Sequence, residues 1–147
     1  MSTILISGAG RGLGLELARQ YAADGWRVIG TVRDAAARSR LEKLGAQAHI
    51  ADVTKREQLA ALARQAKGAA LDVLFCNAGI SGKRGMTLGR FDYESWEEVL
   101  RVNVLGAAAL VEELLDNVAA SERKVIAGLK AQDSGRFFSY DGSSIPW

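Results

Sequence analysis

Short apolar runs alternate with helical repeats along this sequence, and the alternation limits the folds that the chain can adopt. We predict strands over residues 3–7, 26–32, 46–53, 71–79 and 124–129. Between them we predict helices over residues 13–25, 35–45, 55–68 and 93–119, with Thr54 and Asp92 as the N-caps of the last two. Four strands are almost continuously apolar, which is typical of parallel strands covered on both faces. Right-handed crossovers then predict an α/β fold, a Rossmann-like doubly wound parallel sheet of about five strands in the order 3-2-1-4-5, with helices on both faces.

The composition is that of an ordinary globular domain and argues against several other classes of protein. We expect a single domain over residues 1–147, with an irregular segment at 130–147. The formal net charge of +2 and the lack of a basic cluster with interleaved aromatic residues argue against nucleic-acid binding. No apolar run reaches the roughly 18 residues of a membrane span, and no metal-ligand spacing is present. The one cysteine, Cys76, and the lack of a signal-peptide pattern lead us to expect a cytoplasmic protein.

A glycine-rich stretch, ISGAGRGLG at 6–14, follows the first predicted strand and opens the first predicted helix. Its spacing is G-x-x-x-G-x-G over Gly8, Gly12 and Gly14. A helix N-terminus attracts anions through free N–H groups and its dipole, and glycine lets a pyrophosphate approach the backbone. No Lys-Ser/Thr pair follows, which excludes a P-loop. We therefore predict a dinucleotide site, the alternative being a purely structural turn.

Four short motifs occur in order along the sequence: SGAGRGLG at 7–14, ADV at 51–53, CNAG at 76–79 and RVNVLG at 101–106. Together they resemble the short-chain dehydrogenase/reductase family, with Ser7 in place of the threonine of T-G-x-x-x-G-x-G. The resemblance extends from residue 2 to about 129, and is closest to carbonyl-reductase-like members related to the C-factor group. It implies an oxidoreductase that acts on a small-molecule carbonyl or alcohol with a nicotinamide cofactor.

The resemblance also implies a role for individual residues. Asp52 would bind the adenine, and Asn103 would be the family's structural and catalytic asparagine. The implied cofactor-binding residues are Ser7, Gly8, Arg11, Gly12, Leu13, Gly14, Arg33, Asp52, Val53, Asn77, Ala78 and Gly79. Taken singly, these residues have structural interpretations as well. Asp52 could cap the next helix, Asn77 could hold adjacent strands together, and Asn103 could be a buried polar residue of the long helix.

The end of the second predicted strand discriminates between the two nicotinamide cofactors. A carboxylate there binds the ribose 2′-OH of NAD(H), and by resemblance this position falls on Val32. Arg33 follows it and Arg11 lies within the glycine-rich loop, so two guanidinium groups could bind the 2′-phosphate of NADP(H). We therefore favour NADP(H) over NAD(H). In the alternatives, Asp34 reaches the ribose, or both arginines are merely solvated.

The other catalytic residues implied by the resemblance are not found. The family uses a serine at the end of the fifth strand and a Tyr-x-x-x-Lys pair. Lys130 and Ala131 occupy the serine position, and Tyr140, a poor match to the tyrosine, has Ser144 four residues later. We therefore expect a chain truncated before the Tyr-x-x-x-Lys motif and lacking the family's C-terminal strands. Such a chain would bind the cofactor with weak or no turnover.

Two other functions remain open from the sequence. The chain could be a non-catalytic dinucleotide-binding module, or an interaction domain that uses an exposed face of helix 93–119. The alanine and leucine residues of this helix could also simply be core. If they form an uncovered apolar face, that face predicts a homo-oligomer.

Overall fold

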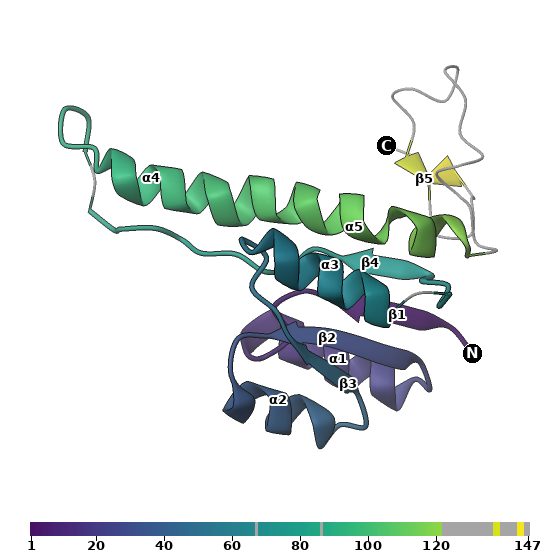
Figure 1. The fold of residues 1–147 in the computed structure, drawn as a ribbon. Helices are drawn as coiled ribbons and strands as arrows, with labels where there is room; N and C mark the ends of the chain where they lie inside the picture. The colour runs from purple at the N-terminus through teal and green to yellow at the C-terminus, as the bar shows by residue number, and fades with distance from the viewer. Residues whose placement is uncertain (67, 86, 122–136, 139–143, 146–147) are drawn as a thin grey trace.

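The computed structural model describes residues 1–66, 68–85, 87–121, 137–138 and 144–145. A four-stranded parallel sheet in the order β3-β2-β1-β4 forms its centre (Figure 1). The strands are β1 (Thr3–Ile6), β2 (Arg27–Val32), β3 (Gln47–Ile50) and β4 (Val73–Phe75). The order of the first four predicted strands is thus confirmed. The predicted fifth strand, at 124–129, lies outside the described residues.

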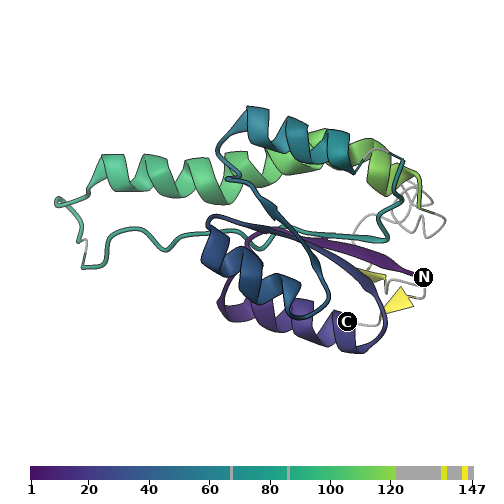
Figure 2. The same cartoon turned by 60° about the horizontal axis from the view of Figure 1, so that its bottom comes forward.

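Helices cover both faces of this sheet (Figure 2). On one face lie α1 (Gly12–Ala23) and α2 (Ala35–Glu42), and on the other lie α3 (Arg56–Gln65) and one long helix. This arrangement confirms the predicted doubly wound architecture. Within the part of the chain that the structure describes, no helix has both the length and the apolar character needed to cross a membrane.

A buried apolar cluster on each face joins the sheet to its helices. Ile4 of β1 lies in one cluster with Leu41 of α2. The next residue, Leu5, lies in the other cluster with Leu59 of α3 and Leu110 of the long helix. Successive side chains of a strand point to opposite faces, so β1 contributes to both cores. All five side chains are fully buried, and each such burial is worth about 1.5–3 kcal/mol.

The long helix is continuous but changes its hydrogen-bond pattern in the middle. It consists of α4 (Tyr93–Leu100), a π-helical segment η1 (Arg101–Gly106) and α5 (Ala107–Ala119). Asp92 caps its first turn as predicted, since Oδ1 accepts from the Ser95 N–H at 3.0 Å. Because π-helical segments are frequent at functional sites, η1 is a candidate position for a site.

Three local predictions were wrong. The third predicted strand, 46–53, is shorter in the structure, where β3 covers Gln47–Ile50. Thr54 does not cap α3, because the helix begins at Arg56 with Lys55 at the N-cap position. The Thr54 hydroxyl donates instead to Oδ1 of Asp52 at 2.7 Å. The fourth strand is also shorter than predicted and ends at Phe75. Beyond it, the chain turns across the end of β1.

The C-terminal part of the chain is described at four residues. β5 (Phe137–Phe138) and β6 (Ser144–Ile145) form an antiparallel pair. The other residues of 130–147, including Lys130, Ala131 and Tyr140, lie outside the described residues. The expectation of an irregular segment at 130–147 therefore stays a prediction.

Candidate functional site

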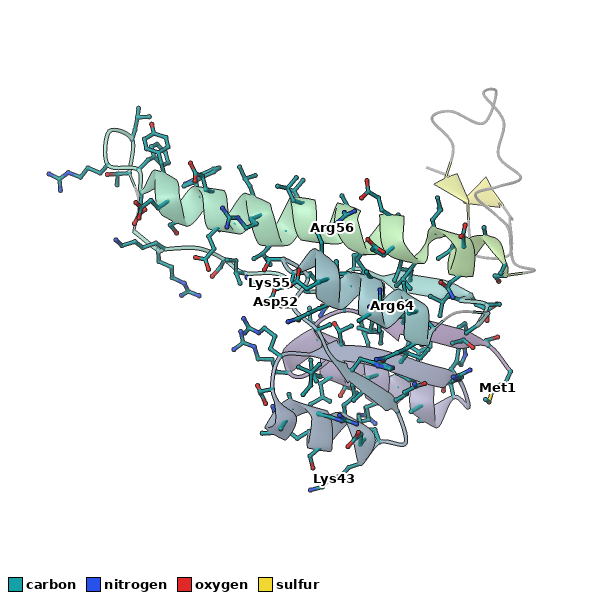
Figure 3. The ribbon with its side chains drawn as sticks, viewed as in Figure 1. Met1, Lys43, Asp52, Lys55, Arg56 and Arg64 are labelled. Atoms are coloured by element: carbon teal, nitrogen blue, oxygen red, sulfur yellow. The ribbon has the colours of Figure 1, made fainter. Side chains whose placement is uncertain are left out.

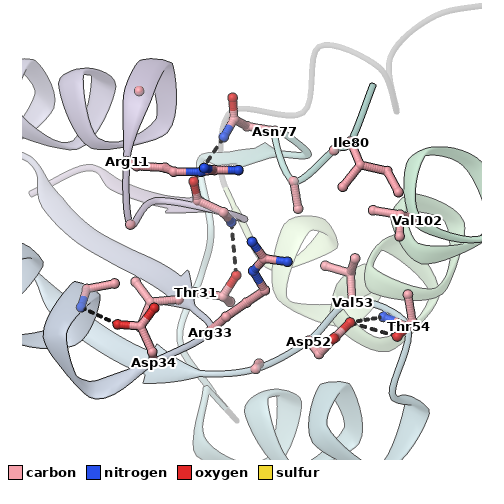
Figure 4. A pocket seen from close by; sticks show the side chains of 18 of the residues that line it. Arg11, Thr31, Arg33, Asp34, Asp52, Val53, Thr54, Asn77, Ile80 and Val102 are labelled. Carbon is pink, nitrogen blue, oxygen red and sulfur yellow. Dashed lines mark hydrogen bonds between the residues drawn. The ribbon is translucent and has the colours of Figure 1, made fainter. Parts of the chain in front are cut away.

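A pocket of about 550 Å³ opens at the carboxyl ends of the parallel strands (Figure 4). Ten of the predicted cofactor-binding residues line it: Gly8, Arg11, Gly12, Leu13, Arg33, Asp52, Val53, Asn77, Ala78 and Gly79. Ser7 and Gly14 do not. The pocket lies where β2 and β4 flank β1, which is the point where the strand order reverses. In open α/β sheets, ligands bind at this switch point.

Hydrogen bonds to two neighbouring strands fix the first part of the glycine-rich loop. The Ser7 N–H donates to the Phe75 carbonyl at 2.9 Å, and the Ala9 N–H donates to the Thr31 carbonyl at 2.8 Å. The Gly8 N–H donates to the Thr31 hydroxyl at 3.1 Å. The end of the loop therefore has a defined position beside the first turn of α1.

Gly14 is needed for packing, which explains why it does not line the pocket. A Cβ on this residue would overlap the Gly8 carbonyl oxygen and lie 2.5 Å from Nδ2 of Asn77. Only glycine lets α1 pack this closely against the loop that precedes it. The N-terminus of α1 is thereby held at the pocket.

A hydrogen-bond network joins the glycine-rich loop to the turn after β4. The Ser7 hydroxyl accepts from the N–H groups of Asn77 and Ala78, both at 3.0 Å. Nδ2 of Asn77 donates to the carbonyls of Ser7 at 3.1 Å and Gly8 at 3.2 Å. Asn77 therefore holds the ends of β1 and β4 together, and its side chain is part of the pocket wall.

The three residues at the end of β2 differ in their surroundings. Val32 ends the strand. Oδ1 of Asp34 accepts from the Ala37 N–H at 2.7 Å and so caps α2. The guanidinium groups of Arg33 and Arg11 both point into the pocket (Figure 4). Neither makes a hydrogen bond or an ion pair with any residue that the structure describes. Two cations thus face a pocket whose lining also includes the carboxylates of Asp34, Asp52 and Glu98. Of these, Asp34 caps α2.

Asp52 lies across the pocket from α2, in the turn before α3. Its Oδ1 accepts from the N–H of Thr54 at 2.8 Å as well as from the Thr54 hydroxyl. These two hydrogen bonds, with a smaller contribution from the charge of Arg33, hold the pKa of the Asp52 carboxyl below its usual value. The carboxyl group is therefore ionised at neutral pH and fixed in position by the turn.

Asn103 lies outside this pocket, on the η1 segment. Its Oδ1 accepts from the Ile80 N–H and its Nδ2 donates to the Ile80 carbonyl, both at 2.9 Å. It lines an adjoining open recess of about 770 Å³ that shares Arg11 and Asn77 with the pocket. Asn103 is exposed, so the idea that it is only a buried polar residue is wrong.

Several pocket residues were missed by the sequence analysis. Apart from Val32 and Asp34, they are Gly10, Thr31, Ala37, Arg40, Ala51, Thr54, Ile80, Glu98, Arg101 and Val102. Arg40 follows the pocket residue Ala37 by three positions, a spacing that places both on one face of a helix. This spacing is the sequence signal from which Arg40 could have been identified as a pocket residue. Thr31 and Ile80 belong to no motif, and their contribution depends on the fold.

Comparisons with known proteins agree with this geometry. Residues 2–128 match the family model described as short chain dehydrogenase. Over 106 residues the chain is 39% identical to a galactitol 2-dehydrogenase (L-tagatose-forming) of Cereibacter sphaeroides, covering 69% of this chain and 41% of that protein. The chain therefore spans less than half the length of this relative.

Two solved structures share the fold. One is a short-chain dehydrogenase/reductase from Burkholderia multivorans with bound NADP, at 33% identity and a TM-score of 0.72, covering 79% of this chain and 53% of that one. The other is a 3-ketoacyl-(acyl-carrier-protein) reductase from Brucella melitensis complexed with NADH, at 30% identity and a TM-score of 0.71, covering 79% and 50%. Structures of this fold thus occur with either nicotinamide cofactor.

Proposed function

Because the chain belongs to the short-chain dehydrogenase family, we propose that its pocket binds NADP(H) for the oxidation of an alcohol or the reduction of a carbonyl. The substrate would be a small molecule, and we place the reaction in the cytoplasm. The bound nicotinamide would supply or accept the hydride. The chain spans about half the length of its solved neighbours, so the activity of a whole enzyme is part of this proposal.

The pocket residues fit the parts of a dinucleotide. The N-terminus of α1 would bind the pyrophosphate through its free N–H groups, with Gly12 (φ +55°) leaving the approach open. Asp52 and Val53 would contact the adenine, on the side of the pocket near α3. Asn77 would keep the loop in place, and Asn103 would keep the turn at Ile80 beside the nicotinamide end.

The two free arginines are the observation that carries the choice of NADP(H). A 2′-phosphate needs cations, and Arg11 and Arg33 point into the pocket with no side-chain hydrogen bond or ion pair to any described residue. NAD(H) specificity uses a carboxylate at the end of β2. Here that position is Val32, and the nearby Asp34 caps α2.

Turnover by residues 1–147 is expected to be weak or absent. The reaction needs a group that exchanges a proton with the substrate oxygen, and such general acid–base help contributes about 10²–10⁴ in rate. No tyrosine in the described part of the chain has a lysine four positions later. We therefore propose cofactor binding as the function of this chain by itself.

Replacing Arg33 tests the cofactor assignment. We expect Arg33→Ala to raise the Kd for NADPH about tenfold or more and to change the Kd for NADH little, because only NADPH carries the 2′-phosphate. Fluorescence titration of each reduced cofactor measures both constants. Arg38→Ala is a matched control, since Arg38 is an exposed arginine of α2 outside the pocket and pairs with Glu42.

Two results would contradict these proposals. An equal loss of affinity for NADPH and NADH in Arg33→Ala would remove the basis for NADP(H) preference. Turnover of a carbonyl panel by the wild-type chain at ordinary enzyme rates, above about 1 s⁻¹, would refute the proposal of weak or absent catalysis. Binding without turnover is the expected result.

A second candidate function is that of an interaction domain. The observation that favours it is a row of exposed apolar side chains along the long helix: Trp96, Leu100, Val104, Val111 and Leu115. We call this row the apolar stripe. It supports self-association of the chain, and it is compatible with cofactor binding at the pocket.

A further inference from the structure

Arg40 reaches the glycine-rich loop from the last turn of α2. Its Nη2 donates to the main-chain carbonyl of Gly10 at 3.2 Å, although the two residues are 30 positions apart. Arg40 also lines the pocket. Its guanidinium group has five N–H donors, so most of them remain available beside the bond to Gly10.

The sheet holds the first half of the loop but not the second. Ser7, Gly8 and Ala9 are bonded to β2 and β4. The N–H groups of Gly10 and Arg11 donate to no residue within the described ranges, and Arg11 provides no side-chain cap for α1. Among the described residues, the bond from Arg40 is thus the hydrogen bond that ties Gly10 to the rest of the domain.

Packing and hydrogen bonding act together at Gly10. A Cβ on Gly10 would lie 2.9 Å from the Cβ of Ala37, so the loop backbone lies directly against α2. Because a peptide unit is planar, the Gly10 carbonyl and the Arg11 N–H point in opposite directions in one plane. Fixing the carbonyl therefore fixes the direction of the Arg11 N–H, immediately before the anion-binding end of α1.

We propose that Arg40 is a positioning residue for the anion-binding loop. It holds the Gly10–Arg11 peptide in the orientation that pyrophosphate binding needs. The proposal rests on the proposed function of the pocket. The two arginines then have different roles. Arg33 distinguishes NADPH from NADH, whereas Arg40 acts on the loop that would bind the pyrophosphate of either cofactor.

Variants of Arg40 test this role by cofactor titration. Arg40→Met keeps a long unbranched stem and removes the donors and the charge, whereas Arg40→Lys keeps a donor and the charge. We expect Arg40→Met to raise the Kd values for NADPH and NADH by about tenfold each, leaving their ratio unchanged. Arg40→Lys should restore most of the affinity. Arg38→Met, on the same helix but outside the pocket, should bind as the wild type does.

A measurement without cofactor keeps this proposal separate from the proposed function. Backbone NMR order parameters of Gly10, Arg11 and Gly12 should be lower in Arg40→Met than in Arg38→Met, because the peptide has lost its tether. Unchanged order parameters would overturn the positioning role. So would a loss confined to NADPH, which would make Arg40 a direct ligand of the 2′-phosphate. If the wild-type chain bound neither cofactor, the proposed function would fail and the order parameters alone would decide the role of Arg40.

Discussion

At the scale of single residues, Arg33 and Asp34 are neighbours in the sequence with opposite charges and different environments. The Arg33 side chain points into the pocket, while the Asp34 carboxylate accepts the Ala37 N–H at the start of α2. A sequence pattern cannot separate these environments, because either residue could end β2 in a slightly shifted register. The hydrogen bond of Asp34 gives its carboxylate a structural role at a helix N-terminus, where a negative charge is stabilising, although Asp34 also lines the pocket.

Two substitutions at Asp34 separate its structural role from a role in binding. Asp34→Ala removes the cap and should lower the free energy of unfolding by about 1 kcal/mol, while Asp34→Asn keeps an acceptor and should change it little. Urea denaturation measures both. We expect Asp34→Asn to bind NADH as the wild type does. A large loss of NADH affinity in that variant would mean that Asp34 binds the ribose.

Thr54 and Arg40 show which residue roles the sequence could not predict. Thr54 has the residue type of an N-cap, but the Asp52 carboxylate engages its hydroxyl and the helix begins two residues later. The bond of Arg40 to Gly10 joins two elements whose approach depends on the fold. By contrast, the motif residues that line the pocket were predictable, because local spacing places them at the ends of strands.

At the scale of elements, contacts of the central η1 segment determine where the long helix lies. Asn103 binds the main chain of Ile80 on one side of η1. At the end of η1, a Cβ on Gly106 would lie 2.8 Å from Cγ2 of Val53 and 3.2 Å from its carbonyl oxygen. The helix therefore lies directly against the segment after β3, which brings Val102 to the pocket wall.

Replacing Gly106 tests this close approach. Alanine favours a helix over glycine by about 1 kcal/mol, but Gly106→Ala has to push the helix away from Val53. We expect overpacking to dominate and to lower the free energy of unfolding by about 1–3 kcal/mol, measured by urea denaturation. Val53→Ala should lessen this loss when both changes are combined, because it removes the closest atom. A Gly106→Ala variant more stable than the wild type would refute the predicted clash.

The order of the elements was predictable because each depends on local periodicity. The apolar runs at 3–7 and 26–32 predicted β1 and β2 to within one residue at either end. The run at 71–79 overstated β4, which covers 73–75. Apolar composition continues to Cys76, but the Asn77 N–H donates back to the Phe75 carbonyl and to the Ser7 hydroxyl, which makes a turn rather than a further strand residue. Strand β4 thus ends at a turn that is bonded to the distant Ser7, although the apolar composition of the sequence continues.

At the scale of the whole molecule, the apolar stripe lies on the outer side of the domain. Its side chains are between 43% and 58% exposed. Their spacing of four or seven residues puts them on one face of the long helix. Lys43, by comparison, lies at the opposite side of the molecule, beyond α2 (Figure 3). The homo-oligomer predicted from helix 93–119 would bury this stripe.

Charged substitutions in the stripe test self-association. We expect the wild-type chain to associate with increasing concentration, and the double variant Leu100→Glu/Leu115→Glu to remain monomeric in sedimentation velocity, because like charges would meet at the apolar contact. A Lys43→Glu chain, whose net charge falls by the same amount, serves as the control and should associate as the wild type does. Equal association of all three proteins would rule out the stripe as the contact.

The hydrogen bonds between the Ser7 hydroxyl and the turn at Asn77 also determine when the pocket can form during synthesis of the chain. The residues they join are 70 and 71 positions apart, so the N-terminal loop has no fixed wall until that turn has been synthesised. Contacts between such distant residues form late, since the long intervening chain must first be ordered. The pocket wall that Asn77 and Ala78 form is therefore complete only after residue 78 has been synthesised.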